Sequence, residues 1–124
     1  MMIDPFHIIE KFELFHEYWT PKIIAELNDQ YVKLAKLKGT FVWHSHENED
    51  ELFFVVKGTL RLKFRDRDEV VLGEGEMFIV PAGIPHLPVA EKECWVMLIE
   101  PKSTLHSGST ETDRSVNPKD QEWI

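Results

Sequence analysis

Short apolar stretches separated by turn residues run from Lys22 to Glu100, and this spacing constrains the fold more than any other feature of the chain. The stretches are rich in β-branched and aromatic residues, whereas Gly, Pro, Asn and Asp lie between them. Several short strands at such spacing are typical of an all-β sandwich or barrel. The strands that we expect cover residues 22–27, 31–37, 40–46, 51–56, 59–64, 69–72, 77–80 and 94–100.

Two parts of the chain allow a second interpretation. A helix over residues 21–37 competes with the first two strands, because Ala, Leu, Lys and Glu are good helix formers. The Asn28-Asp29 pair in its middle favours a tight turn, so we prefer two strands. Residues 6–19 are compatible with either a strand or a short helix. Before the last strand we expect an irregular segment, since proline cannot donate to a strand ladder, at Pro81, Gly83, Pro85 and Pro88.

The length of the chain fits a single domain. Residues 1–124 are too few for a second domain of ordinary size, and we place the barrel core at about residues 22–100. From residue 102 onward Ser, Thr, Asp, Asn and Pro dominate, so residues 102–124 are interpreted as a loose tail. The alternative is that Trp123 and Ile124 dock on the body of the domain or on a second subunit.

An excess of acidic residues narrows the range of partners. The chain has 14 Lys and Arg against 22 Asp and Glu, which gives a formal net charge of −8. This balance argues against nucleic acid or an anionic membrane as the main partner. Apolar runs are too short to span a membrane, and the N-terminus lacks the features of a secretion signal. Cys94 is the single cysteine and forms no intrachain disulfide, which favours a cytoplasmic location and a packing role.

Four side chains predict a metal site. His44 and His46, two residues apart on a strand, place both imidazoles on one face. Glu51 opens the next antiparallel strand and returns beside them, and His86 follows the proline-rich corner. Three imidazoles and one carboxylate suit one divalent transition metal, with Fe, Mn, Ni, Cu, Co and Zn all compatible. The histidine pair by itself is weak support, because isolated histidines are more often solvated or hydrogen-bonded.

Glycine and proline spacings around these residues are more specific. Four residues separate His46 from Glu51, and six separate Glu51 from Gly58. In the second block, Gly75, Pro81, Gly83 and His86 follow the spacing Gly, five residues, Pro-x-Gly, two residues, His.

Over residues 39–99 the chain therefore resembles the cupin superfamily. The resemblance implies a double-stranded β-helix, the cupin or jelly-roll barrel, in a small single-domain metal-binding protein. There are two departures from the family pattern. Gly39 precedes His44 by four intervening residues where five are usual, and Ala90 stands where the family often has Asn. Neither change removes a ligand position.

Strand alternation also predicts a pocket. If His44 and His46 face the interior, so does Val42, while Phe41, Trp43 and Ser45 face away. In the next strand Phe53 and Val55 face inward with Glu51. An apolar pocket lined by Val42, Phe53 and Val55 would suit a small organic ligand or substrate, and simple core filling is the equal alternative.

Three functions are compatible with the resemblance. The first is a metal-dependent enzyme of the dioxygenase or sugar-phosphate isomerase type, and the second is a non-catalytic small-metabolite or sugar-binding protein. The third, a storage module, is disfavoured by the full ligand set. An isomerase needs cations for a phosphate, but Lys57, Arg61 and Lys63 are expected on the outer face. No catalytic residue beyond the metal ligands is identified.

The remaining predictions concern surfaces. Trp43, Phe54 and Val56 are expected on the outer face and need a cover. The resemblance implies that a homodimer provides it, and the alternative is the N-terminal third of the chain itself. The other histidines have no partners at ligand spacing and are assigned to the surface: His7, His16 and His106.

Overall fold

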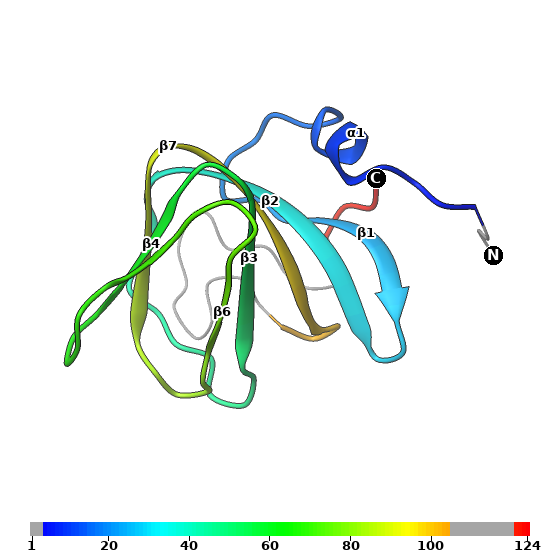
Figure 1. The fold of residues 1–124 in the computed structure, drawn as a ribbon. Helices are drawn as coiled ribbons and strands as arrows, with labels where there is room; N and C mark the ends of the chain where they lie inside the picture. The colour runs from blue at the N-terminus through cyan, green and yellow to red at the C-terminus, as the bar shows by residue number, and fades with distance from the viewer. Residues whose placement is uncertain (1–3, 105–120) are drawn as a thin grey trace.

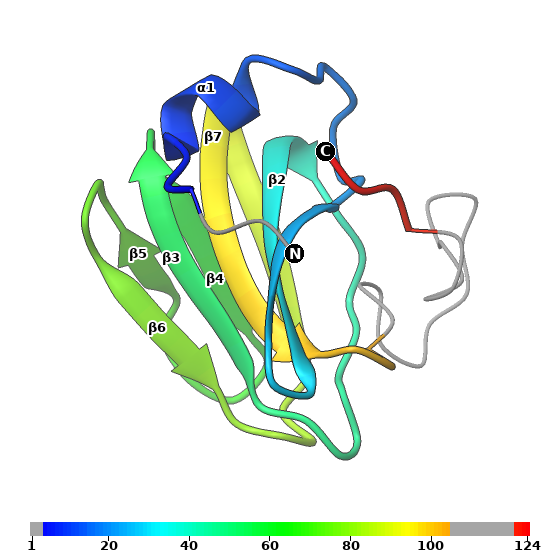
Figure 2. The same cartoon turned by 90° about the vertical axis from the view of Figure 1, so that its right-hand side faces the viewer.

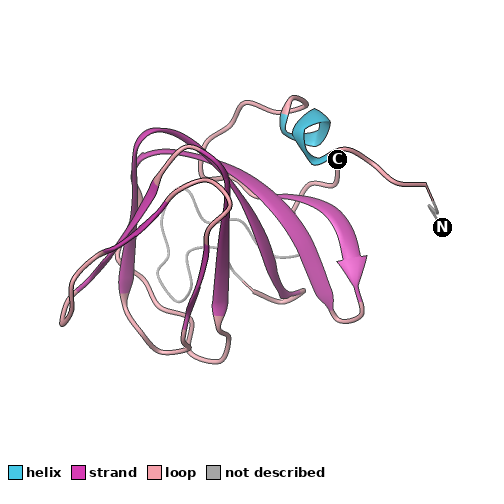
Figure 3. Cartoon of the chain, viewed as in Figure 1, coloured by secondary structure: helices cyan, strands magenta, loops and turns pink. Residues whose placement is uncertain are grey.

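Antiparallel strands make up nearly all of the regular structure in the computed structural model, which describes residues 4–104 and 121–124 (Figures 1 and 3). The strands are β1 Lys22–Leu27, β2 Gln30–Thr40, β3 Glu51–Lys57, β4 Leu60–Phe64, β5 Val70–Leu72, β6 Met77–Val80 and β7 His86–Pro101. One short helix, α1 Ile8–Phe12, precedes them. Within the described residues no helix has the length and apolar character needed to span a bilayer.

The long strand β7 organises the barrel. The strands follow the order β1-β2-β7-β3-β6, and β4 joins β7 to β5. The first part of β7 pairs with β4, and its second part pairs with β3. Between the two parts, residues 91–93 are exposed and the register with β2 shifts after Leu37. This irregularity accompanies the curvature of β7, and the strands surround a common interior (Figures 1 and 2). The predicted all-β, double-stranded β-helix fold is confirmed.

Most predicted strands are present, and two local predictions are wrong. Asn28 turns between β1 and β2 with φ of 55°, so the helix alternative fails. Residues 41–46 form no ladder strand; only an isolated bridge joins His44 to His86. Pro88 lies inside β7 rather than in an irregular segment. The strand tolerates it because Pro88 takes part through its carbonyl, which accepts a hydrogen bond from the Phe41 N–H.

Apolar side chains form two clusters, one on each side of the main sheet. The interior cluster includes Val55, Leu62 and Val96. The outer cluster includes Phe12 of α1, which stacks on Trp95 with ring centroids 4.7 Å apart. Val56 packs against this outer cluster. The N-terminal segment therefore covers part of the outer face, and the main sheet is apolar on both sides.

The last residues of the chain dock on the domain. Trp123 forms a bridge with Ile23, and its ring meets the Tyr31 ring edge-on at 5.5 Å. The Ile124 N–H donates to the Ile23 carbonyl at 3.0 Å. The prediction of a loose tail is thus wrong for residues 121–124, because the edge of β1 offers backbone groups and Tyr31 of β2 offers an aromatic partner. The rest of the predicted tail, residues 105–120 with His106, lies outside the described residues.

The turn between β3 and β4 leads to a stability prediction. Gly58 has φ of +89°, and a Cβ atom there would lie 2.8 Å from the Glu93 carbonyl oxygen. Gly58→Ala should lower the free energy of unfolding by about 2–4 kcal/mol through conformational strain and overpacking. Gly75→Ala is the matched control, because Gly75 has φ of +83° but no atom within 4 Å of the added Cβ. Urea denaturation measures both; equal losses would contradict the predicted clash.

Candidate metal centre

The structure brings together all four residues of the predicted metal site. Glu51 opens β3 and His86 opens β7, whereas His44 and His46 lie on the segment that follows β2. Backbone hydrogen bonds in both directions join His44 to His86, at 3.1 and 2.9 Å. All four side chains are buried, and their candidate ligand atoms lie within 4.8 Å of one another. The metal ligand set itself remains a prediction.

One carboxylate oxygen is the centre of the group. Oε1 of Glu51 lies 2.9 Å from His86 Nε2 and 3.1 Å from His46 Nε2. It lies 3.8 Å from His44 Nε2, which is too far for a hydrogen bond. Three imidazole nitrogens therefore converge on a single buried anion.

Backbone carbonyls orient two of the imidazoles. Nδ1 of His44 lies 2.9 Å from the Val42 carbonyl, and Nδ1 of His86 lies 2.9 Å from the Ile84 carbonyl. Because a carbonyl only accepts, each Nδ1 carries the proton, and in the neutral ring Nε2 presents a lone pair. The lone pair of His86 then faces a carboxylate oxygen at 2.9 Å, and this repulsive contact requires a cation, either a proton or a metal.

An orphaned atom also fits a metal. Nε2 of His44 is buried and has no hydrogen-bond partner. A buried polar atom without a partner is costly, so its presence needs an explanation. A divalent transition metal among the four residues would satisfy it, and three imidazole nitrogens with one carboxylate oxygen suit such an ion. The four side chains therefore fit a divalent transition metal.

The electrostatic surroundings of the site favour a buried negative charge on Glu51. Burial alone would raise the pKa of Glu51, but the neighbouring imidazoles outweigh burial and hold this pKa well below its ordinary value. Burial likewise would lower the pKa of His46, but Glu51 outweighs it and the pKa is raised. Glu51 is therefore ionised, and the site attracts a cation.

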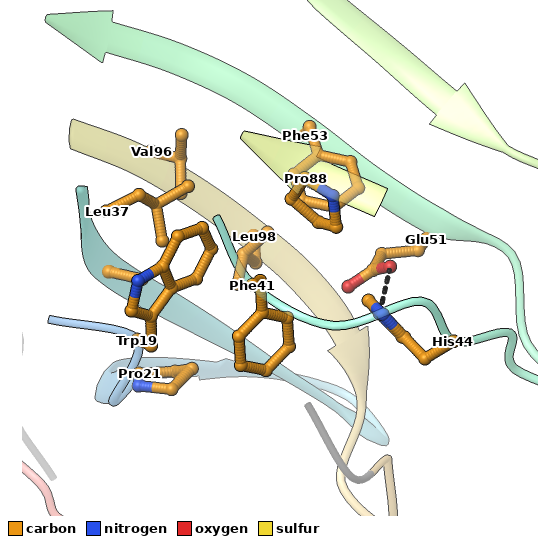
Figure 4. A pocket seen from close by; sticks show the side chains of 11 residues that line it. Trp19, Pro21, Leu37, Phe41, His44, Glu51, Phe53, Pro88, Val96 and Leu98 are labelled. Carbon is orange, nitrogen blue, oxygen red and sulfur yellow. Dashed lines mark ion pairs between the residues drawn. The ribbon is translucent and has the colours of Figure 1, made fainter. Parts of the chain in front are cut away.

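An apolar cavity adjoins the group (Figure 4). Its volume is about 30 Å³, and His44 and Glu51 form one side of it. Trp19 and Phe41, whose rings stack 4.7 Å apart, contribute aromatic walls. Sequence reasoning missed both, because Trp19 lies on an irregular segment and Phe41 was expected to face outward. No periodic signal marks either residue.

The predicted pocket residues divide between the cavity and the core. Phe53 lines the cavity. Val55 faces inward but is fully buried in the interior cluster, and Val42 is half-buried against that cluster, so neither lines the cavity. The prediction for Val42 fails because residues 41–46 are not an extended ladder strand, and strand alternation does not apply there.

Comparison with known proteins identifies the family. The cupin domain family model (Cupin_2) matches residues 30–100, more than half of the chain. The chain belongs to the cupin family. The resemblance predicted from the glycine and proline spacings is thereby confirmed.

Individual relatives match this cupin over different lengths. The solved structure of a cupin-2 domain containing protein from Shewanella frigidimarina NCIMB 400 is 47% identical, with a TM-score of 0.75, over 77% of this chain and 93% of that one. The uncharacterized protein YdbB of Bacillus subtilis is 40% identical over 63 residues, 51% of this chain and 56% of YdbB. 3-Hydroxyanthranilate 3,4-dioxygenase 2 of Aspergillus fumigatus is 34% identical over 80 residues, 60% of this chain and 42% of that enzyme. The cupin thus spans about half the length of these two curated relatives.

A buried ion pair lies in the same interior. Lys33 of β2 and Glu100 of β7 are both fully buried, with Nζ and Oε1 2.9 Å apart. Burial raises the pKa of Glu100, a shift that Lys33 opposes and the charge of Glu51 reinforces. Sequence reasoning missed the pair, because Lys33 alternates with Val32 and Leu34 and resembles a solvent-facing residue.

The other predicted residues of interest lie away from the cavity. Burial raises the pKa of the Cys94 thiol to about 12, consistent with inert packing. Arg61 pairs with Glu69 at 2.6 Å and with Glu91 at 3.4 Å. Lys57 lies 4.6 Å from the centroid of the Trp95 ring. Arg61, Lys57 and Lys63 do not line the cavity. His7 and His16 are exposed, as expected.

Proposed function

We propose that this cupin binds one divalent transition metal through His44, His46, Glu51 and His86, and acts on a small organic molecule as an oxygenase-type metalloenzyme. The observation that carries the proposal is the buried, ionised Glu51 surrounded by three imidazoles, one of which has an orphaned Nε2. Fe, Mn, Ni, Cu, Co and Zn all remain compatible with the donor set. Similarity to 3-hydroxyanthranilate 3,4-dioxygenases supports the oxygenase type.

The residues of the chain divide the work between holding the metal and excluding water. A bound metal would act as a Lewis acid, and any of the compatible ions except the redox-inactive Zn would also make dioxygen chemistry accessible. Carbonyls of Val42 and Ile84 hold two imidazoles in the orientation that leaves Nε2 available. The Glu51 carboxylate would offset part of the charge of a bound metal. The apolar cavity walls exclude bulk water from the side that an organic ligand would occupy.

A reconstitution experiment tests the proposed function. The protein is loaded with Fe(II) or Mn(II), and oxygen consumption is followed over catechols, thiols, 1,3-diketones and sugar phosphates. We expect consumption with at least one oxidisable ligand, and none with metal-free protein or with His46→Ala. If no ligand causes oxygen consumption but some ligands shift the thermal unfolding midpoint, the proposed enzyme activity is contradicted. That result would support a non-catalytic metabolite- or sugar-binding protein. Turnover of sugar phosphates without oxygen would support an isomerase, which is disfavoured because no Lys or Arg lines the described cavity.

We also propose that this cupin forms a homodimer through the outer face of β3 and β6. Met77 and Ile79 are 56% and 50% exposed, and they lie opposite Phe54 and Leu52 in the ladder. This apolar face is only partly covered by the N-terminal segment. Light scattering after size exclusion should give a mass of two chains for the wild-type protein at micromolar concentration. The Ile79→Asp variant should give the mass of one chain. Val71→Asp on β5, 46% exposed, is the control. A monomeric wild-type protein would refute the dimer.

A further inference from the structure

Among residues 4–104 and 121–124, none that lines the cavity beside the candidate metal centre could receive an organic anion. In the described lining, the ionisable residues are His44 and Glu51, both assigned to metal binding. The indole N–H of Trp19, the other hydrogen-bond donor in the wall, donates to the Lys38 carbonyl at 2.9 Å. A carboxylate held against these described walls would therefore meet neither a cation nor a free donor, which is unfavourable.

The buried or nearby cations of the described residues do not supply a positive charge to the cavity. Lys33 is buried but is ion-paired with Glu100, and neither residue lines the cavity. Lys36 donates to the Phe15 carbonyl at 2.8 Å, and its Nζ lies over the Trp95 ring on the outer side of the sheet. The chain as a whole carries a formal charge of −8, which disfavours the approach of an anion.

The cavity is also small. A volume of about 30 Å³ is about a fifth of that of an engineered cavity that accepts benzene, which measures about 150 Å³. Leu37, Phe53 and Val96 project from strands held in ladders, so these walls are fixed. Trp19 lies on the segment before β1, in a left-handed backbone conformation with φ of 59°. In Figure 4 its indole forms the side of the pocket opposite His44 and Glu51.

We infer that the site selects a small uncharged molecule with a metal-binding end, rejects molecules whose tail carries a carboxylate or phosphate, and uses Trp19 as the limit on ligand size. The inference rests on the proposed function, since the metal is the anchor for the ligand. It also separates this cupin from its dioxygenase relatives, because 3-hydroxyanthranilate is a carboxylate.

A matched ligand pair tests the charge preference. 4-Methylcatechol and 3,4-dihydroxybenzoate carry the same two hydroxyls, and differ by a methyl or a carboxylate at one ring position. Calorimetric titration of the anaerobic Fe(II)-loaded protein should give a dissociation constant at least about tenfold lower for 4-methylcatechol. Equal or tighter binding of 3,4-dihydroxybenzoate would overturn the inference, and so would failure of 4-methylcatechol to bind both the wild-type protein and Trp19→Ala at stoichiometric iron.

Variants at Trp19 test the size limit. Trp19→Ala should strengthen binding of 4-methylcatechol by about threefold or more, because removal of the indole opens space for the ring. Trp19→Leu gives a smaller gain and serves if the alanine variant does not fold. Trp43→Ala is the control. The Trp43 ring centroid lies 4.6 Å from Cζ of Arg65, and Trp43 does not line the cavity. Unchanged or weaker binding in both Trp19 variants would overturn the size limit.

Iron content measured on the same samples separates the two proposals. Wild-type protein without bound iron, or His44→Ala with full iron, contradicts the proposed metal site and removes the basis of the inference. Stoichiometric iron with the wrong ligand preference contradicts only the inference about ligand charge and size.

Discussion

His44→Ala should remove most of the metal from the purified cupin. We expect elemental analysis to find about one equivalent of transition metal in the wild-type protein and less than about a tenth in the variant after dialysis. The physical reason is that Nε2 of His44 is buried, is oriented by the Val42 carbonyl and has no other partner. Removing it leaves an incomplete donor set in a closed interior.

The control for this prediction is His16→Ala. His16 is exposed and is not part of the buried His and Glu group. Its replacement should leave metal content and the thermal unfolding midpoint unchanged. Full metal stoichiometry in His44→Ala would refute the site, and equal loss of metal in both variants would show that the loss is not specific to the site.

Lys33→Met should destabilise the fold severely. Breaking a buried ion pair by removing one partner typically costs about 3–5 kcal/mol, because the remaining charge is buried without compensation. Here that charge is the carboxylate of Glu100, whose surroundings include the ionised Glu51. For a domain of this size we expect the thermal midpoint to fall by roughly 10–20 °C. Calorimetry of the metal-free protein measures the change without a contribution from metal binding.

A double variant shows whether the loss comes from the unpaired charge. Lys33→Met combined with Glu100→Leu removes both charges at similar volume and should recover most of the stability. Lys102→Met is the surface control: Lys102 and Glu26 are also paired, at 3.0 Å, but their side chains are 39% and 49% exposed. Lys102→Met should lower the free energy of unfolding by less than about 1 kcal/mol. A double variant as unstable as Lys33→Met would mean that lost packing, rather than the isolated carboxylate, is responsible.

Turns and hairpins were predictable from local sequence. The β1–β2 hairpin turns at Asn28, and the chain turns between β3 and β4 at Gly58, both with positive φ. β3 and β4 pair with different parts of β7 and not with each other, so the turn was predicted but a hairpin there was not found. The bounds of these four strands agree with the expected ones within three positions. Turn chemistry depends on neighbouring residues only, so the sequence carries it directly. The same holds for the glycine and proline spacings, from which both the cupin family and the four grouped side chains were predicted.

Longer-range features were not predictable in this way. Strand alternation tells which residues share a face, but not which face is covered by another part of the chain. Lys33 follows the pattern of a solvent-facing residue, yet it is fully buried, because its side of the sheet is the barrel interior and α1 covers the other side. Trp19 and the docked residues 121–124 likewise gain their places from contacts with distant segments.

The sequence by itself thus determined the strand pattern, the family and the identity of the three histidines that meet around Glu51. Only the tertiary structure decided that their Nε2 atoms converge on one carboxylate oxygen, that Trp19 rather than Val42 walls the cavity, and that Lys33 and Glu100 pair inside. The reason is that period-two alternation and turn residues are local, whereas burial depends on which segments close over each face.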